Sequence, residues 1–308
     1  MIRTPTVLIL GAGASKPYAF PTGRELLVRI CTDLEEQESP LTRTLVELGN
    51  SLSKLKGFGT ALALSCLPSV DVFLEERPEF LQLGKAAIAS ALLPFEREHR
   101  LLRTRQRDML WYEYLFGHLR APPAKLDENR LKIVTFNYDR SLEQALFLAF
   151  MHSYGLDDTA AAKAVEKIPI VHVYGSLAPL PWQDATGLRY HSAANAANTQ
   201  RCAENIRILH EGSREADLFT RAQLWIRHAK VICFLGFGYH QTNIARLGIP
   251  EELTTQEVFG TAVGLQKAEQ ERVKKMFETK DSQGSRIFLG DNGQDVLYFL
   301  REQRVFRP

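Results

Sequence analysis

The chain has 308 residues and a mass of 34.8 kDa, and 45% of its residues are hydrophobic, which is ordinary for a globular protein with a sizeable core. Its 38 basic and 36 acidic residues give a formal net charge of +2, so no overall field would attract nucleic acid or an anionic membrane. We therefore expect no direct contact with nucleic acid and no membrane association.

Six runs of residues are predicted as strands, and most of them are continuously apolar rather than alternating. Continuous apolar runs are typical of strands covered by helices on both faces, which favours a parallel sheet. The predicted strands are residues 6–10, 132–136, 168–174, 231–235, 259–265 and 286–289. The chain is thus predicted as an α/β protein with a Rossmann-like parallel sheet.

The long segment between the first two predicted strands has helical character. It contains too many residues for a single crossover helix, so we expect a helical insertion subdomain at residues 24–130, inside one domain that spans residues 1–308. A second irregular stretch, residues 181–199, is polar and is expected to form a long loop over the sheet edge.

The first predicted strand leads directly into the sequence LGAGASKPYAFPTGREL. Gly11 and Gly13 let the backbone turn tightly, Ser15 can cap the next helix, and freed N–H groups would form a cradle for an anion. Lys16 stands where a GxGxxG motif has its third glycine, and the acidic residue that dehydrogenases use is absent, so an ordinary Rossmann dehydrogenase is disfavoured. The alternative is a glycine turn that only packs a strand against a helix.

Three further predicted strands also end in small or polar residues. In an open parallel sheet, ligands bind outside the carboxyl ends of the strands, so these endings and the first are predicted to converge on one site. A buried amide and carboxylate there need partners, which a substrate would supply. The endings lie in KIVTFNYDRSL with Asn137 and Asp139, in IVHVYGSL with Gly175 and Ser176, and in VICFLGFGYHQTN with Gly236, Gly238, His240 and Asn243.

The four motifs GAGAS, TFNYD, YGS and GFG, in this order, resemble the sirtuin (silent-information-regulator) superfamily of NAD-consuming enzymes. The closer resemblance is to the sirtuin-like effector branch of bacterial antiphage defence. The matched motifs are short, but their order and spacing extend from Gly11 to Asn243. The resemblance implies a sirtuin/DHS-like sheet and NAD+ as the substrate.

The resemblance also implies roles for individual residues. Asn137 matches the active-site asparagine that orders water and ribose hydroxyls, and Asp139 matches the residue that reads the nicotinamide carboxamide. Gly236 and Gly238 match the strand end that contacts the adenosine half. The cofactor-binding residues implied in this way are Gly11, Ala12, Gly13, Ser15, Asp139, Tyr174, Gly175, Ser176, Gly236, Gly238 and Asn243.

The general base is where the chain departs from the family. Sirtuins use the histidine of an HGS triplet, and here Tyr174 precedes Gly175 and Ser176; a tyrosine with a pKa near ~10 would serve poorly as a base. His172 shares a strand face with Tyr174 but lies about 7 Å further from the strand end. We expect Asn137 and His172 to be catalytic; the alternative for His172 is a histidine packed in the sheet. His240 is a further candidate, although an exposed loop residue is the favoured reading there.

The family's structural zinc is the second departure. Cys31, Cys66, Cys202 and Cys233 form no CxxC pair, so we expect no zinc module, no bound metal and no disulfide framework, and a cytoplasmic location. Peptide deacylation is therefore disfavoured. Asp71, in the predicted insertion, either lines the pocket mouth or is a helix N-terminal acid favoured by the dipole.

The function implied is an NAD+ glycohydrolase that releases nicotinamide and ADP-ribose, with a cyclic product left open. In the effector branch it would deplete NAD+ during phage infection, held inactive until a homo-oligomer or a partner protein such as a HerA-type ATPase or a short Argonaute orders the site. The rival hypothesis is a catalytically weak subunit that binds NAD or ADP-ribose, in which Tyr174 marks a lost base. A protein deacylase is the third.

Overall fold

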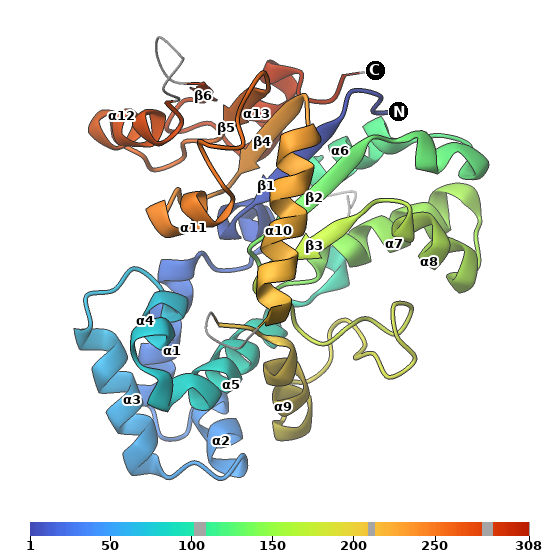
Figure 1. Ribbon diagram of the computed structural model, residues 1–308. Helices are drawn as coiled ribbons and strands as arrows, with labels where there is room; N and C mark the ends of the chain where they lie inside the picture. Colours follow the sequence, from blue (N-terminus) through green and yellow to red (C-terminus); the bar gives the residue numbers. More distant parts are fainter. Residues whose placement is uncertain (102–108, 209–212, 279–285, 308) are drawn as a thin grey trace.

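A parallel sheet of six strands forms the centre of the computed structural model, which describes residues 1–101, 109–208, 213–278 and 286–307 (Figure 1). The strand order is β3-β2-β1-β4-β5-β6, and every neighbouring pair is parallel. The strands are β1 (Thr6–Leu10), β2 (Leu131–Thr135), β3 (Ile170–His172), β4 (Val231–Leu235), β5 (Glu257–Gly260) and β6 (Ile287–Leu289). The predicted α/β class with a Rossmann-like parallel sheet is confirmed.

Burial explains why the apolar runs become strands. All five residues of β1 and all five of β4 are buried, because helices cover both faces of the sheet. The α-helices are α1 (Gly23–Glu35), α2 (Pro40–Glu47), α3 (Leu52–Leu64), α4 (Val70–Glu76), α5 (Leu81–Leu92), α6 (Trp111–Leu119), α7 (Ser141–Tyr154), α8 (Asp158–Glu166), α9 (Ala196–Asn205), α10 (Ser213–His228), α11 (Gln241–Arg246), α12 (Lys267–Met276) and α13 (Val296–Gln303). Short 3₁₀ helices are η1 (Ala12–Tyr18), η2 (Pro78–Phe80), η3 (Leu93–Phe95), η4 (Glu98–Arg100) and η5 (Pro123–Glu128).

Two predicted strands were too long. The run predicted at residues 168–174 is a strand only over Ile170–His172, because the chain then turns and the N–H of Gly175 donates to the carbonyl of His172 at 3.2 Å. The run predicted at 259–265 is a strand over Glu257–Gly260, and Gly264 takes a left-handed φ of 82° in the turn that follows. In both places apolar residues continue past the end of the ladder.

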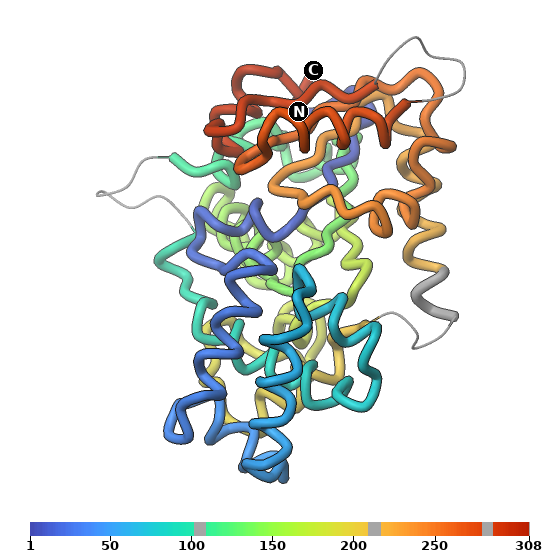
Figure 2. The backbone as a smooth tube through the Cα atoms, turned by 90° about the vertical axis from the view of Figure 1, so that its left-hand side faces the viewer, coloured from blue at the N-terminus to red at the C-terminus, as the bar shows by residue number. Residues whose placement is uncertain are grey.

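A helical layer lies beside the carboxyl ends of the strands, at the bottom of Figure 1 and again in the side view of Figure 2. It consists of α1 to α5 and α9, with α9 packed against α5 and α2. Polar caps start several of these helices: Thr22 and Glu25 form a capping box on α1, and Ser51 and Ser69 accept from backbone N–H groups of α3 and α4.

The helical layer does not coincide with the predicted insertion, residues 24–130. Helix α6 lies inside that range but packs against α7 and α13, beside the sheet. Helix α9 lies outside it, after β3, yet belongs to the layer. A unit of residues 24–130 therefore stays a proposal, and the layer itself is built from two separate parts of the chain. Across the described ranges, no helix is long and apolar enough to span a membrane.

Candidate functional site

The register of the sheet aligns the ends of four strands. Leu10, the last residue of β1, pairs with Thr135 of β2 on one side and Leu235 of β4 on the other. Thr135 pairs in turn with His172, the last residue of β3. The strand order reverses between β1 and β4, which is where open α/β sheets place their ligands. The motifs singled out in the sequence thus begin along one edge.

The glycine turn after β1 packs directly on the turn after β4. A Cβ on Gly11 would lie 2.6 Å from the carbonyl oxygen of Gly236, and a Cβ on Gly13 would lie 2.8 Å from the Cα of Gly236. Gly236 itself has a φ of 57°, and a Cβ there would lie 2.0 Å from the backbone nitrogen of Ala14. Only glycines allow the two backbones to approach this closely.

The backbone N–H groups of this turn are already paired. Those of Gly11, Gly13 and Ala14 donate to carbonyls of Leu235, Gly236 and Gly11 at 2.9 to 3.0 Å. The expected cradle of freed N–H groups is therefore wrong for these three. What the structure shows for the glycines is close packing; Gly11 caps η1, which begins at Ala12 and contains Gly13 and Ser15.

Asn137 lies against the glycine turn, two residues after the end of β2. Its Nδ2 donates to the carbonyl of Gly11 and to Oγ of Ser15, both at 3.0 Å. The carbonyl can only accept, which fixes the orientation of the amide. Asn137 is 8% exposed, and its Oδ1 has no hydrogen-bond partner among the described residues. One end of this amide is held firmly and the other is left open to a donor.

Asp139 is held by hydroxyl groups. Its Oδ2 accepts from Ser15 Oγ at 2.8 Å, and its Oδ1 accepts from both the N–H and the hydroxyl of Ser141. Ser141 in turn accepts from the hydroxyl of Tyr112 at 2.6 Å. Burial raises the pKa of Asp139, and these hydrogen bonds oppose that shift. The prediction that the substrate supplies the hydrogen-bond partners of Asp139 is wrong, because the protein itself donates hydrogen bonds to both of its oxygens.

His172 joins the same site, because β3 ends at this residue. Its Nδ1 lies 2.8 Å from the backbone carbonyl of Asn137, and its Nε2 lies 2.5 Å from Oε1 of Glu143 on α7. Burial alone would lower the pKa of His172, but the Glu143 carboxylate and the hydrogen bonds from Glu143 and Asn137 raise it above its ordinary value. His172 is thus brought together with Asn137 without any shift of strand register.

Tyr174 points to a different neighbour. Its hydroxyl donates to Oδ1 of Asn243 at 2.6 Å and accepts from Arg246 at 2.6 Å, both on α11. The expectation that His172 and Tyr174 share a face is wrong, because residues 173 and 174 lie in a turn rather than in β3. Burial raises the pKa of Tyr174 well above its ordinary value, although Arg246 opposes the shift, so this phenol is a poor base.

The remaining predicted residues lie further out. Gly175 has a φ of 67°, and a Cβ there would lie 2.1 Å from the carbonyl oxygen of Asn205, so it serves a close backbone crossing. The hydroxyl of Ser176 donates to the carbonyl of Leu177 at 2.9 Å. Gly238 and His240 are exposed on the turn before α11, and His240 is thus the exposed loop residue that was predicted.

Two side chains of α4 reach the site from the helical layer. Asp71 accepts a hydrogen bond from the hydroxyl of Tyr138, and Glu75 lies 3.3 Å from Arg246. Asp71 therefore faces the loop after β2, and its pKa is raised by burial. These contacts fasten the helical layer to the loops after β2 and to α11.

A small cavity lies between these groups. It is lined by Asn137, Asp139, Glu143 and His172 together with Ser15, Tyr112 and apolar neighbours, and its volume of about 10 Å³ suits one water molecule. The described residues hold no group of three or more His, Cys, Asp or Glu side chains placed to bind a metal ion.

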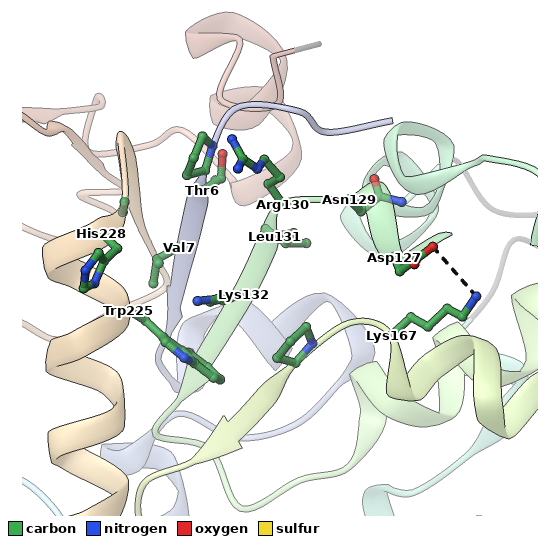
Figure 3. A pocket seen from close by; sticks show the side chains of 13 residues that line it. Thr6, Val7, Asp127, Asn129, Arg130, Leu131, Lys132, Lys167, Trp225 and His228 are labelled. Carbon is green, nitrogen blue, oxygen red and sulfur yellow. Dashed lines mark ion pairs between the residues drawn. The ribbon is translucent and has the colours of Figure 1, made fainter. Parts of the chain in front are cut away.

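A larger cavity, of about 380 Å³, opens at the amino ends of the strands (Figure 3). Lys132 lies there 5.4 Å from the ring centroid of Trp225, and Lys167 lies 4.0 Å from Asp127. Helices α8 and α10 end beside it, so basic side chains complement the negative ends of their dipoles. The motif residues line the smaller cavity instead, and we place the candidate site there.

Comparison with known proteins adds little to this geometry. No protein-family model matches the chain, and no curated protein matches it either. One solved structure that matches is a mutant Sir2 homologue in complex with 2′-O-acetyl ADP ribose, with a TM-score of 0.41 and 14% identity, over 97% of this chain and 91% of that one. A score and an identity this low carry no inference about activity, so the chemistry has to come from the site itself.

Three residues of the site are not among those predicted from the sequence motifs. Glu143, Ser141 and Tyr112 complete the hydrogen bonds of His172 and Asp139. A signal for the first two exists, since Ser141 and Glu143 are polar residues in the first turn of a helix that continues with a run of apolar residues from Ala145 to Met151. Tyr112 offers no such signal.

Arg140 and Glu96 form a buried ion pair behind the site. Two nitrogens of Arg140 donate to the two oxygens of Glu96, at 2.8 and 2.6 Å. The remaining terminal nitrogen donates to backbone carbonyls of the irregular stretch after β3, those of Ala178, Pro179 and Leu188. Arg140 directly follows Asp139, so this pair anchors the loop that carries the site.

Proposed function

We propose that this chain hydrolyses NAD+ to nicotinamide and ADP-ribose at the carboxyl ends of β1, β2 and β3. The observation that carries the proposal is the Asn137 amide: Nδ2 is held by Gly11 and Ser15, the buried Oδ1 has no partner among the described residues, and Asn137 lines a cavity together with His172 and Glu143. An unpartnered buried acceptor costs about 1–3 kcal/mol, so a water or a ribose hydroxyl that donates to Oδ1 is favoured. The four sirtuin-like motifs at these strand ends support NAD+ as the substrate.

The reaction asks little of the protein. Nicotinamide leaves NAD+ as a neutral molecule, so the bond needs no acid to protonate the leaving group. The protein has to hold the ribose, orient a water and accept its proton in a desolvated place. Asn137 would orient the water or the ribose, and the His172 and Glu143 pair supplies the proton acceptor.

Entry of the substrate requires the site to open. A dinucleotide fills a pocket of several hundred Å³, whereas the cavity of about 10 Å³ suits one water. We propose that the closed arrangement is the resting state and that an oligomer or a partner protein separates α4 from α11, breaking the contacts of Glu75 with Arg246 and of Asp71 with Tyr138. A resting state of this kind suits an NAD+-depleting effector in antiphage defence, with a HerA-type ATPase or a short Argonaute as the partner.

A second candidate function is a subunit that binds NAD or ADP-ribose without turning it over. It is favoured by Tyr174, which stands at the position of the family's histidine and bonds Asn243 and Arg246 on α11 rather than the cavity residues. Protein deacylation is the third candidate and would need turnover of an acylated peptide.

The test is nicotinamide release from NAD+ by the purified chain, alone and with the protein encoded beside it, followed by liquid chromatography. Asn137→Ala is expected to reduce turnover by about 100-fold or more, whereas Asn198→Ala on α9, whose amide nitrogen donates to the nearby Ala193 carbonyl, should leave it unchanged. Tight NAD+ binding with no release in any assembly state would favour the binding subunit. Phage challenge of cells that carry the gene, with NAD+ levels measured, tests the defence role separately.

A further inference from the structure

The hydrogen bonds of His172 determine which of its nitrogens carry protons. Nδ1 faces the backbone carbonyl of Asn137 at 2.8 Å, and a carbonyl oxygen has no proton to give. Nδ1 must therefore be protonated and act as the donor. The position of this histidine proton is thus set by the main chain of Asn137, which also lines the cavity.

The second ring nitrogen is occupied as well. Nε2 lies 2.5 Å from Oε1 of Glu143, so the two atoms are joined by a hydrogen bond with one proton between them. The ring is either a cation beside a carboxylate, or neutral and accepting from a protonated Glu143. In both cases Nε2 has no free lone pair. His172 therefore cannot take a proton from a bound water while these two bonds persist.

In the form with a cationic ring beside a carboxylate, the free proton-accepting capacity in the cavity lies on Glu143. A carboxylate offers about four lone-pair positions, and His172 occupies one of them. Asp139, the other carboxylate of the cavity, already accepts three hydrogen bonds from Ser15 and Ser141. Glu143 is buried, lines the same cavity as Asn137, and is oriented by the histidine.

From this geometry we infer that Glu143 is the general base of the proposed hydrolysis and that His172 is a positioning residue, which holds the Glu143 carboxylate toward the cavity. The inference rests on the proposed function. A water loses a proton to Glu143 while its oxygen bonds to C1′ of the ribose; the C1′–nitrogen bond breaks, and its electron pair leaves with neutral nicotinamide. The proton on Glu143 then passes to solvent.

The first experiment observes the pair without any substrate. The protein is labelled with ¹⁵N-histidine, and the His172 ring is assigned by its loss in His172→Gln. At pH 7.5 we expect a cationic ring, with the signals of protonated nitrogens at both Nδ1 and Nε2, beside a Glu143 carboxylate; in Glu143→Gln the ring should change to a neutral form. A wild-type ring with an unprotonated Nε2, either free of Glu143 or accepting from a protonated Glu143, overturns the inference, whatever the activity of the protein.

The second experiment compares turnover and binding in matched variants. Glu143→Gln preserves shape but cannot accept the proton, so nicotinamide release should fall by 10²- to 10⁴-fold with NAD+ affinity retained. His172→Gln keeps a donor for Glu143 and should lose about 10-fold or less. Glu166→Gln, exposed at the end of α8, is the control for the charge change. Formate should restore part of the activity of Glu143→Ala, as a free carboxylate replacing the lost one.

The outcomes separate the two proposals. If the wild type releases nicotinamide and Glu143→Gln retains more than about a tenth of that rate, or if His172→Gln is the more damaged variant, the assignment of the base is wrong and the proposed function stands. If the wild type releases no nicotinamide in any assembly state, the proposed function fails, and the base assignment fails with it.

Discussion

Replacing Glu96 with glutamine is expected to destabilise the protein by about 3–5 kcal/mol, because it removes the negative partner of a buried arginine. The side chains of Arg140 and Glu96 are 2% and 0% exposed, so water cannot replace the lost carboxylate. The geometry is bidentate, with both oxygens of Glu96 engaged. The guanidinium also donates to three backbone carbonyls, so it cannot move toward solvent without breaking those hydrogen bonds.

The expected change in melting temperature follows from chain length. An unfolding entropy of about 2.1 cal/mol/K per residue gives about 0.65 kcal/mol/K for 308 residues, so 3–5 kcal/mol corresponds to a loss of about 5–8 °C. Differential scanning calorimetry of the wild type and Glu96→Gln measures this shift. Glu98→Gln on η4, just two residues away, is a nearby charge control.

A double replacement sharpens the test. Exchanging both members of a buried ion pair for apolar residues is often neutral elsewhere. Here Arg140→Met with Glu96→Leu would remove the Arg140 donor from the carbonyls of Ala178 and Leu188, at about 1–3 kcal/mol for each buried group left unpaired, whereas the Pro179 carbonyl keeps the N–H of Leu188. The double variant should therefore remain destabilised. If the double variant were as stable as the wild type, the hydrogen bonds from Arg140 to the loop would contribute nothing to stability, and the argument would be refuted.

Three further predictions follow from single positions. Gly236→Ala should lower the free energy of unfolding in urea by more than about 2 kcal/mol, because the added Cβ would overlap neighbouring backbone and the φ is 57°. In the control, Gly57→Ala in α3, the added Cβ meets nothing within 4 Å, so this variant should be more stable by about 0.5–1 kcal/mol. Similar effects at both sites would contradict the packing argument. The carboxyl groups of Glu143 and Asp139 face His172, and its pKa is raised. The stability that the protonated histidine contributes is therefore complete below about pH 6.5 and is lost as the pH rises through the raised pKa. The free energy of unfolding of the wild type and of His172→Gln is measured at pH 6 and at pH 9. The difference between the two proteins should be smaller at pH 9 than at pH 6; a larger difference at pH 9 would contradict the raised pKa. Tyr174→Phe removes two hydrogen bonds to α11 and should cost about 1–2 kcal/mol by the same measurement, while no change would make those bonds dispensable.

The sheet and the convergence of its strand ends could be predicted from sequence for a definite reason. Four consecutive apolar residues in β1 and five in β4 mark strands buried on both faces, and parallel strands bring their carboxyl ends to one edge. The contact between Asn137 and the Gly11 turn follows from that topology, because β1 and β2 are neighbours.

What the sequence could not supply depends on side chains meeting across distant segments. The position where β3 ends decides whether His172 or Tyr174 faces the cavity, and an apolar run does not mark its own end to within a residue. Glu96 and Tyr112 approach the site from between β1 and β2, through packing that leaves no periodic pattern. The entry of α9 into the helical layer is likewise a tertiary event.

The glycine contact between the turns after β1 and β4 limits how the molecule can admit a ligand. Three residues without side chains interlock there, backbone on backbone, and hydrogen bonds stitch the two turns together. These contacts leave the two turns little freedom to separate. For the proposed NAD+ substrate, we therefore expect room to come from displacement of the helical layer, and variants that loosen α4 should widen access while the packing of the two turns stays unchanged.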